Sequence, residues 1–261
     1  MGLPIKIEKE ILKLHNKKNR KELYKYIVEG IICVNELLNA GIEPEYIVHT
    51  ENFAENPKGK ELLKRIKKIN APVYSVDENV FRKLVDTVSP QGIFCIAPMR
   101  FQPIEQALDN PKSKIILLDK ISDPGNLGTI IRTAAALNMS GIMILSNSVE
   151  LYNMKVIRSA LGSHLHIPIM NDIEPEFVIE TLLQKKFKIF AAMPSGGENF
   201  KTALNNADKT AVVIGNEHHG VDKLFYENAN ISSVHIPINQ KIESLNAAVT
   251  AAIIMSQLSY K

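Results

Sequence analysis

The sequence predicts an α/β protein with two domains, a small mixed α/β domain followed by a larger domain built on a parallel sheet. The chain has 261 residues, of which 45% are hydrophobic and 23% are charged, the balance of a globular protein that buries a core. A domain takes roughly 100–200 residues, so this length fits one large unit or two smaller ones. The second half alternates apolar strands with helices more strictly than the first half, which favours two domains.

The first half is expected to form the small mixed domain. An amphipathic helix precedes an apolar strand, and that strand runs into a second helix closed by Gly41. The expected helices are residues 5–15, 31–39, 58–69 and 77–86, and the expected strands are residues 26–30, 46–49, 73–76 and 93–97.

A proline-rich stretch separates the two halves. Residues 98–111 contain three prolines and have low β-propensity, which is typical of a connecting segment. We therefore expect a first domain at residues 1–100, a linker at 101–111 and a second domain at 112–261.

The second half is expected to form a parallel sheet with helices on both faces, because its short strands are wholly apolar. The expected strands are residues 114–118, 141–145, 166–169, 188–192, 211–215 and 234–237, and the expected helices are residues 126–137, 155–160, 175–185, 221–227 and 245–258. In such sheets ligands bind at the loops beyond the carboxyl ends of the strands. Chemistry is therefore expected after Leu118, Ala192, Gly215 and Pro237.

The charge is distributed unevenly along the chain. The net charge of +3, from 31 basic and 28 acidic residues, excludes a polybasic protein. Residues 1–100 hold 17 basic and 13 acidic residues, or +4, and the remainder hold 14 and 15, or −1. The N-terminal basic cluster consists of Lys13, Lys17, Lys18, Arg20, Lys21 and Lys25. Such a cluster suits a polyanion, whose phosphates it neutralises, and the alternative is a solvated helix face.

The loop after Leu118 contains a turn, Pro124-Gly125, followed by Asn126, a good N-cap for the next helix. Gly128 is a poor helix former and favours close approach of a backbone or ligand. Arg132 follows Asn126 by six residues, about one and two-thirds helical turns. Such an arginine is a functional group, a surface cation or the partner of a buried carboxylate.

The other two loops also carry polar groups. Gly215 and Gly220 bracket a polar run that contains Glu217, and Ser244 and Asn246 open the last helix. The adjacent histidines of this run, His218 and His219, lack the i, i+4 spacing of a helical zinc pair and a nearby third ligand, so we expect no metal. Neither a Gly-x-Gly-x-x-Gly motif after the first strand nor a Walker loop is found, so the ligand need not be a dinucleotide or a triphosphate.

Cysteine content and hydropathy bear on the cellular compartment. Cys33 and Cys95 are too few for a disulfide scaffold and suit a reducing cytoplasm. The N-terminus lacks the apolar core of a signal peptide, and the longest apolar stretches, such as Ala247 to Met255, are shorter than the ~20 residues of a membrane span. We expect a soluble cytoplasmic protein.

The three loops together resemble, in order and spacing, the motifs of the SpoU (TrmH-like) branch of the SPOUT RNA methyltransferases. The first motif runs from Asp123 through Arg132, the second is residues 214–220, and the third runs from Ile236 through Asn246. The resemblance covers residues 112–261. The first half is similar to the ribosomal-protein-like RNA substrate-binding domain that often precedes this catalytic domain, through Tyr26-Ile-Val-Glu-Gly30.

The resemblance implies transfer of a methyl group from S-adenosylmethionine to a ribose 2′-hydroxyl of RNA, with 23S rRNA favoured by the type of first domain. It also implies a C-terminal trefoil knot and a homodimer formed through the second domain. The alternatives are a tRNA ribose methyltransferase and a non-catalytic RNA-binding protein that kept the fold. A third alternative, a nucleotide-dependent oxidoreductase, is disfavoured because this sequence lacks the phosphate-binding glycines of such an enzyme.

The resemblance also assigns roles to residues. Arg132 clamps the target phosphate and stabilises the developing alkoxide, because an arginine with a pKa above ~12 is a poor general base. Its expected partners are Asn126 and Glu217, which hold Arg132 and the ribose, and Ser244 and Asn246, which orient the attacking group. The expected cofactor contacts are Met193, Gly215, Asn216, Ile236, Ile238 and Leu245.

The RNA contacts are expected at Lys17, Lys18, Arg20 and Lys21. Arg158 is expected either to contact RNA or to be an exposed cation on a helix.

Two positions depart from the family pattern. Asn216 stands where Gly or Ala is frequent, and His218-His219 stand where small or basic residues are frequent. Neither departure removes a proposed catalytic residue.

Overall fold

The computed structural model describes residues 3–100, 102–205, 208–217 and 219–259. The chain divides into two units. Unit 1 consists of Met1–Arg100 and Tyr152–Leu165, and unit 2 consists of Phe101–Leu151 and His166–Lys261. A two-domain α/β fold is therefore confirmed, but a segment of the second half belongs to the first unit.

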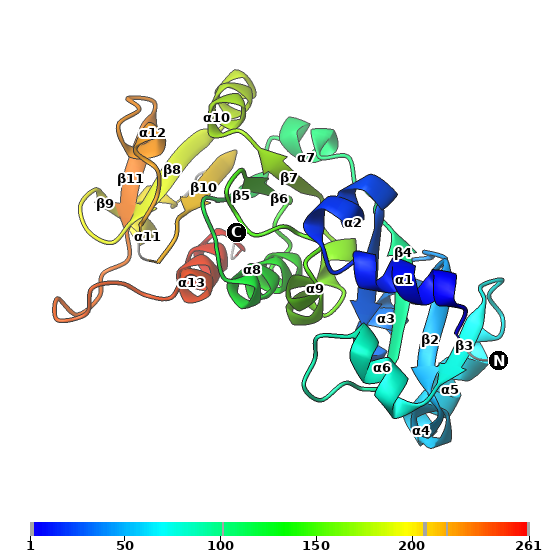
Figure 1. The fold of residues 1–261 in the computed structure, drawn as a ribbon. Coiled ribbons are helices and arrows are strands. Elements are labelled where there is room, and N and C mark those ends of the chain that lie inside the picture. Colours follow the sequence, from blue (N-terminus) through cyan, green and yellow to red (C-terminus); the bar gives the residue numbers. More distant parts are fainter. Residues whose placement is uncertain (1–2, 101, 206–207, 218, 260–261) are drawn as a thin grey trace. The chain divides into compact units, whose positions relative to one another are not determined.

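Unit 2 is built on a seven-stranded sheet of order β7-β6-β5-β10-β8-β11-β9, in which all pairs are parallel (Figure 1). The central strands are buried along nearly their whole length, as wholly apolar strands predict. The strands are β5 (Lys114–Leu118), β6 (Gly141–Leu145), β7 (Ile169–Ile173), β8 (Lys188–Met193), β9 (Glu198–Asn199), β10 (Thr210–Ile214) and β11 (Ile231–His235).

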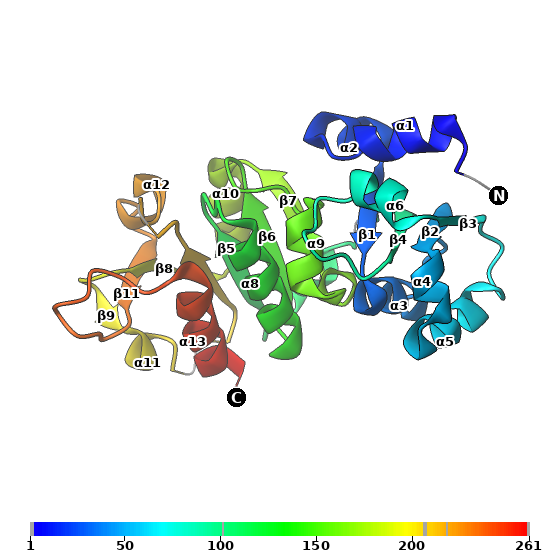
Figure 2. The same cartoon turned by 60° about the horizontal axis from the view of Figure 1, so that its bottom comes forward.

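Helices cover both faces of this sheet (Figures 1 and 2). On one face, apolar side chains of α7 (Glu105–Asp109), α10 (Pro175–Gln184) and α12 (Lys223–Tyr226) join the core. On the other face, α8 (Pro124–Ala136) packs beside α13 (Ala247–Ser259). A further short helix, α11 (Phe200–Ala203), follows β9.

Several elements of unit 2 differ from the sequence prediction, which omitted the short elements β9 and α11. Residues 101–111, predicted as a linker, contain the helix α7, and Ile104, Ala107 and Leu108 are buried in the core of unit 2. Strand β7 begins at Ile169 instead of residue 166, because Pro168 has no N–H to donate to a ladder. As an edge strand, β7 also tolerates polar residues, and it therefore continues through Asn171 and Asp172 to Ile173, beyond the predicted apolar run.

Unit 1 contains a four-stranded sheet of order β1-β4-β2-β3, in which β4 is antiparallel to both neighbours and β2 and β3 are parallel. Apolar residues of α1 and α6 pack on one face, and α3 lies against the other (Figure 2). The strands are β1 (Lys25–Glu29), β2 (Tyr46–Thr50), β3 (Val73–Val76) and β4 (Ile93–Pro98); the helices are α1 (Ile5–Lys13), α2 (Lys17–Leu23), α3 (Ile31–Asn39), α4 (Glu51–Glu55), α5 (Pro57–Ile66) and α6 (Glu78–Leu84).

Arg20 serves the fold of unit 1. Its side chain is buried, and Nη1 donates to the carbonyl oxygens of Leu14 at 2.7 Å and His15 at 2.9 Å. These carbonyls follow the last residues of α1, where a helix lacks hydrogen-bond partners and attracts a cation. The prediction that Arg20 contacts RNA is therefore wrong. Lys17, Lys18 and Lys21, its neighbours on α2, are exposed.

The segment Tyr152–Leu165 completes unit 1. It contains α9 (Met154–Ala160) and a 3₁₀ turn at Ser163–Leu165, and α9 packs against β1. Gly162 fits closely on α3, since a Cβ at this position would lie 2.5 Å from the Cβ of Glu36. The Tyr26 hydroxyl of β1 lies 3.1 Å from His164 Nε2.

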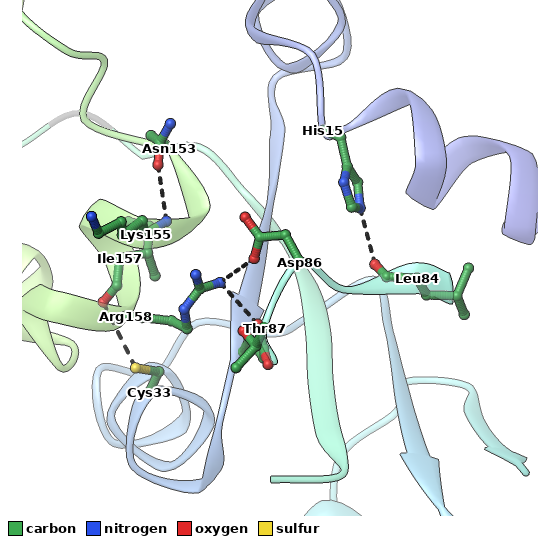
Figure 3. Close-up of polar contacts among 10 residues, drawn as sticks. His15, Cys33, Leu84, Asp86, Thr87, Asn153, Lys155, Ile157 and Arg158 are labelled. Carbon is green, nitrogen blue, oxygen red and sulfur yellow. Dashed lines mark hydrogen bonds and ion pairs between the residues drawn. The ribbon is translucent and has the colours of Figure 1, made fainter. Parts of the chain in front are cut away.

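Arg158 lies on α9 within an ion-pair cluster of unit 1 (Figure 3). Its Nη1 lies 3.0 Å from Glu29 Oε2 and 2.6 Å from Asp86 Oδ1, and Thr87 Oγ1 donates to the same Glu29 oxygen at 2.7 Å. Glu29 is only 4% exposed. Arg158 is thus neither an exposed helix cation nor free of protein partners, and its charge balances a buried carboxylate.

Replacing Arg158 with methionine should lower the free energy of unfolding by about 3 kcal/mol, because the buried Glu29 carboxylate loses its cation. Chemical denaturation of the variant measures this loss. The second replacement Glu29→Gln in the same chain should restore part of the stability. Lys155→Met, on the exposed side of α9, is the matched control and should change stability by less than about 0.5 kcal/mol. Equal losses of stability in Arg158→Met and Lys155→Met would contradict the role of Arg158 as the cation that balances Glu29.

Candidate active site

Four neighbouring strands of unit 2 end beside one another. The sheet order places β5, β10, β8 and β11 in succession, and these are the strands after which the sequence predicts chemistry. Their carboxyl ends share one edge because all pairs are parallel. The three polar loops therefore meet.

Glu217 is the centre of the hydrogen-bond network that joins the three loops. Its Oε1 accepts from Asn126 Nδ2 at 2.8 Å, from Asn246 Nδ2 at 2.5 Å and from the backbone N of Ala247 at 3.0 Å. Asn246 Nδ2 also lies 3.1 Å from Asn126 Oδ1. Each of these predicted catalytic residues thus lies on a different loop and contacts the other two.

Local capping explains why these side chains are held in place. Asp123 is the N-cap of α8 and its Oδ1 accepts from the backbone N of Asn126 at 2.8 Å. Asn246 Oδ1 accepts from the N–H groups of Ala248 and Val249 at the start of α13. Asn246 therefore begins a helix, as predicted, and also presents its side chain to the site. The prediction that Asn126 is the N-cap of α8 is wrong, because Asp123 is the cap and Asn126 lies in the first turn.

The loop that carries Glu217 is a tight turn closed by backbone bonds between Asn216 and Gly220 in both directions, at 3.1 and 2.9 Å. Gly215 is required there, since a Cβ would lie 2.4 Å from the Gly220 carbonyl carbon. Asn216 Nδ2 donates to the carbonyl of Lys120 at 3.0 Å and lies 3.1 Å from Ser122 Oγ. The asparagine that departs from the family pattern thus ties the second loop to the first.

A charged cluster lies beneath these two loops. Lys120 Nζ lies 2.5 Å from Asp222 Oδ2, and this hydrogen bond raises the pKa of Lys120. The pKa of Asp222 is lowered, first by the backbone N–H of Leu224 and then by Lys120. Burial raises the pKa of Asp119, whose Oδ2 accepts from the backbone N of Asp222 at 2.7 Å. These bonds fix the base of the second loop.

Arg132 lies on the exposed side of α8. Within the described part of the chain, its guanidinium has no hydrogen-bond or ion-pair partner. The expected contacts of Asn126 and Glu217 with Arg132 are therefore not formed among the described residues, where these two side chains bond to each other and to Asn246 instead. Arg132 is also not the partner of a buried carboxylate in this structure, which removes one of the alternatives. Its donors are available to a ligand.

A cavity of about 510 Å³ opens beside Glu217. Every predicted cofactor contact lines it, as does Ser244: these residues are Met193, Gly215, Asn216, Ile236, Ile238 and Leu245. The sequence missed Tyr226, Glu243 and Thr250 in the wall. Met193 could be predicted because it lies at the end of the apolar strand β8. Tyr226 belongs to α12, and no strand end in the sequence marks its position.

The described residues also bear on metal binding and on membrane insertion. The described ranges contain no group of three His, Cys, Asp or Glu side chains suited to a metal ion. His219 lies in the cavity wall, whereas His218 lies outside the described residues. None of the helices that the structure describes has the length and apolar character needed to cross a membrane.

Comparison with known proteins agrees with this geometry. A model described as the SpoU rRNA Methylase family matches residues 113–256, and one described as the MRM3-like substrate binding domain matches residues 6–95. The 23S rRNA (guanosine(2553)-2'-O)-methyltransferase RlmP of Bacillus subtilis (strain 168) is 32% identical over 251 residues, which cover 96% of this chain and 94% of the relative.

Two further proteins are similar over nearly the whole chain. The 23S rRNA (adenosine(1067)-2'-O)-methyltransferase of Streptomyces azureus is 25% identical over 246 residues, which cover 92% of this chain and 88% of the relative. The crystal structure of AdoMet-bound rRNA methyltransferase from Sinorhizobium meliloti is 25% identical with a TM-score of 0.84, and the match covers 99% of this chain and 95% of that one. The resemblance predicted from the three motifs is confirmed, and the chain belongs to the SpoU rRNA methylase family.

Proposed function

We propose that this protein transfers a methyl group from S-adenosylmethionine to a ribose 2′-hydroxyl of 23S rRNA. The observation that carries the proposal is the network in which Glu217 joins Asn126 and Asn246 beside an open cavity. The names of the relatives from Bacillus subtilis and Streptomyces azureus give both the chemistry and the RNA. Unit 1 then selects the RNA, in agreement with its match to a substrate-binding domain.

The cavity suits S-adenosylmethionine in size and in chemistry. Its volume of about 510 Å³ lies within the range of roughly 300–1,000 Å³ that is usual for small-molecule sites. Ile214, Ile236 and Leu245 offer apolar walls to an adenine, while the Glu217 and Glu243 carboxylates lie in the wall and attract a sulfonium cation. The cofactor, when bound there, supplies an electrophilic methyl group.

The side chains around the cavity have to position and activate the RNA hydroxyl. A ribose 2′-hydroxyl is a weak acid, so its attack requires help with the proton or with the developing charge. Arg132 keeps its proton, since its pKa is above ~12, and acts by binding the neighbouring phosphate and stabilising the alkoxide. Glu217, Asn126 and Asn246 hold the ribose in position, and Ser244 orients the hydroxyl.

Two architectural proposals accompany this function. The C-terminal part of unit 2 threads through a trefoil knot, as in the family that the chain belongs to. The protein works in the cytoplasm, where its RNA substrate is found, and the burial of the free thiols Cys33 and Cys95 is compatible with that compartment.

We also propose that the protein is a homodimer formed through unit 2. Helix α13 carries no charged side chain, and Val249 on it is 47% exposed. An uncharged helix with an exposed valine favours burial against a second copy. The mass in solution, measured by light scattering, should be twice the 29.1 kDa of the chain. A monomer at all concentrations would contradict this proposal.

Methyl transfer to RNA tests the function directly. The protein is incubated with methyl-labelled S-adenosylmethionine and total RNA from a strain that lacks its gene, and ribose methylation is mapped at nucleotide resolution. Label in 23S rRNA is expected. Label in tRNA alone would change the substrate but retain the enzyme class, and no label in any RNA would favour a non-catalytic RNA-binding protein.

A further inference from the structure

Tyr24 is an exposed aromatic residue in a backbone conformation that seldom accommodates one. It is the C-cap of α2, with a φ of 52° in the left-handed region, and its side chain is 65% exposed. Helix ends of this type usually carry glycine or asparagine, because a Cβ is unfavourable there. A bulky side chain at such a position has a cost in folding, and such costs are concentrated at functional sites.

The backbone of Tyr24 is fixed on both sides. Its N–H donates to the carbonyl of Arg20, and its own carbonyl accepts from Met99 N at 2.7 Å. Arg20 in turn is buried and bonded to the end of α1. The chain turns directly from Tyr24 into β1. The ring is therefore attached to a rigid support and faces solvent.

Three exposed cations lie on the segments that adjoin Tyr24. Lys17 and Lys21 are four residues apart on one face of α2, the helix that Tyr24 caps, and both are exposed. Arg100, also exposed, follows Met99, the residue that bonds to Tyr24. The acidic residue of α2, Glu22, is paired with Lys18 at 3.8 Å. We call Lys17, Lys21, Tyr24 and Arg100 the Tyr24 surface.

We propose that the Tyr24 surface binds RNA by stacking Tyr24 on an unpaired base while Lys17, Lys21 and Arg100 contact the adjacent phosphates. The inference rests on the proposed function and adds the class of RNA element that unit 1 recognises. A ring can stack only on a base that is free of its own stack, so the target is a loop, a bulge or an end. Base–aromatic stacking next to basic groups is the usual design of single-strand binding sites.

Direct binding tests the proposal without requiring catalysis. The probe is 23S rRNA from a strain lacking the gene, with Kd from filter binding and, where transfer occurs, KM and kcat. Tyr24→Ala should raise Kd and KM for RNA about 10-fold, with kcat at saturating RNA and cofactor affinity unchanged. Tyr24→Phe should retain wild-type values. The matched control Phe177→Ala removes an aromatic residue of unit 2 that is 55% exposed and should change nothing.

Two further readouts separate stacking from a structural role. Tyr24→Gly should weaken RNA binding as Tyr24→Ala does, yet keep the Tm at or above the wild-type value because the left-handed strain is relieved. Lys17→Ala should reduce the slope of log Kd against log salt concentration by about 1, and Tyr24→Ala should leave this slope unchanged.

Wild-type Kd for both Tyr24→Ala and Tyr24→Gly would overturn the proposal, as would a lowered Tm in Tyr24→Gly. If the wild-type protein binds 23S rRNA but transfers no methyl group, the proposed function is wrong. The Kd values of the Tyr24 variants then still test stacking, because binding is measured without catalysis.

Discussion

Replacing Arg132 with alanine should lower kcat for methyl transfer by about 100- to 1,000-fold, the usual effect of removing one preorganised donor from a developing negative charge. The fold should not change, because the guanidinium is exposed and has no partner among the described residues. The measurement is single-turnover transfer of labelled methyl to RNA at saturating cofactor. The free energy of unfolding should stay within about 0.5 kcal/mol of the wild-type value.

Lys185→Ala is the control for loss of a cation from unit 2. Lys185 is paired with Asp109 at the surface, at 2.6 Å, and exposed pairs contribute little to stability. Its kcat should equal that of the wild-type protein. Arg132→Lys keeps the charge but loses the planar, forked donor pattern of the guanidinium, so an intermediate rate is expected. Wild-type kcat in Arg132→Ala would show that Arg132 has no role in transfer.

Replacing Glu217 with alanine should have an effect of similar size, by a different route. Three donors lose their shared acceptor: Asn126 Nδ2, Asn246 Nδ2 and the N–H of Ala247. We expect kcat to fall by about 100-fold or more, since small misplacements of positioning groups cost about that much. Stability should fall by only about 1–2 kcal/mol, because the groups are partly exposed and water replaces the lost bonds.

A double-mutant cycle makes the Glu217 prediction specific. Asn126→Ala and Glu217→Ala break the same bond, so their combined loss of kcat should be much smaller than the product of the single losses. Glu217→Gln keeps a carbonyl oxygen without the charge and should retain more activity than Glu217→Ala. Independent effects of the two alanine replacements would contradict the joint role of these residues.

The location of the candidate site could be predicted from the sequence because its parts lie at strand ends, and the resemblance to the family supplied the roles proposed for its residues. Apolar strands are recognised from composition, and a parallel sheet brings their carboxyl ends to one edge. Gly215 carried the local signal of a tight turn, whereas the helix cap predicted at Asn126 lies three residues earlier, at Asp123. The network centred on Glu217 then follows from the meeting of three loops, as observed.

What the sequence did not predict depends on contacts between distant residues. Arg20 counted as one more cation of a basic cluster, and only the packing of α2 against α1 buries it. Arg158 has its partners 129 and 72 residues away, at Glu29 and Asp86. Counting charged residues gives no information on side-chain orientation. The count could therefore identify the basic region but not which of its side chains face solvent.

The insertion of Tyr152–Leu165 into unit 1 has a consequence for synthesis on the ribosome. At roughly 5–20 residues per second, the 65 residues from 101 to 165 take about 3–13 s to be made. During this time α9 is missing, and β1, the strand it covers, is an uncovered sheet edge of the kind that associates with other chains. Unit 1 therefore cannot complete its fold until β5 and β6 of unit 2 have been synthesised, so the two units do not fold in the order of their first residues.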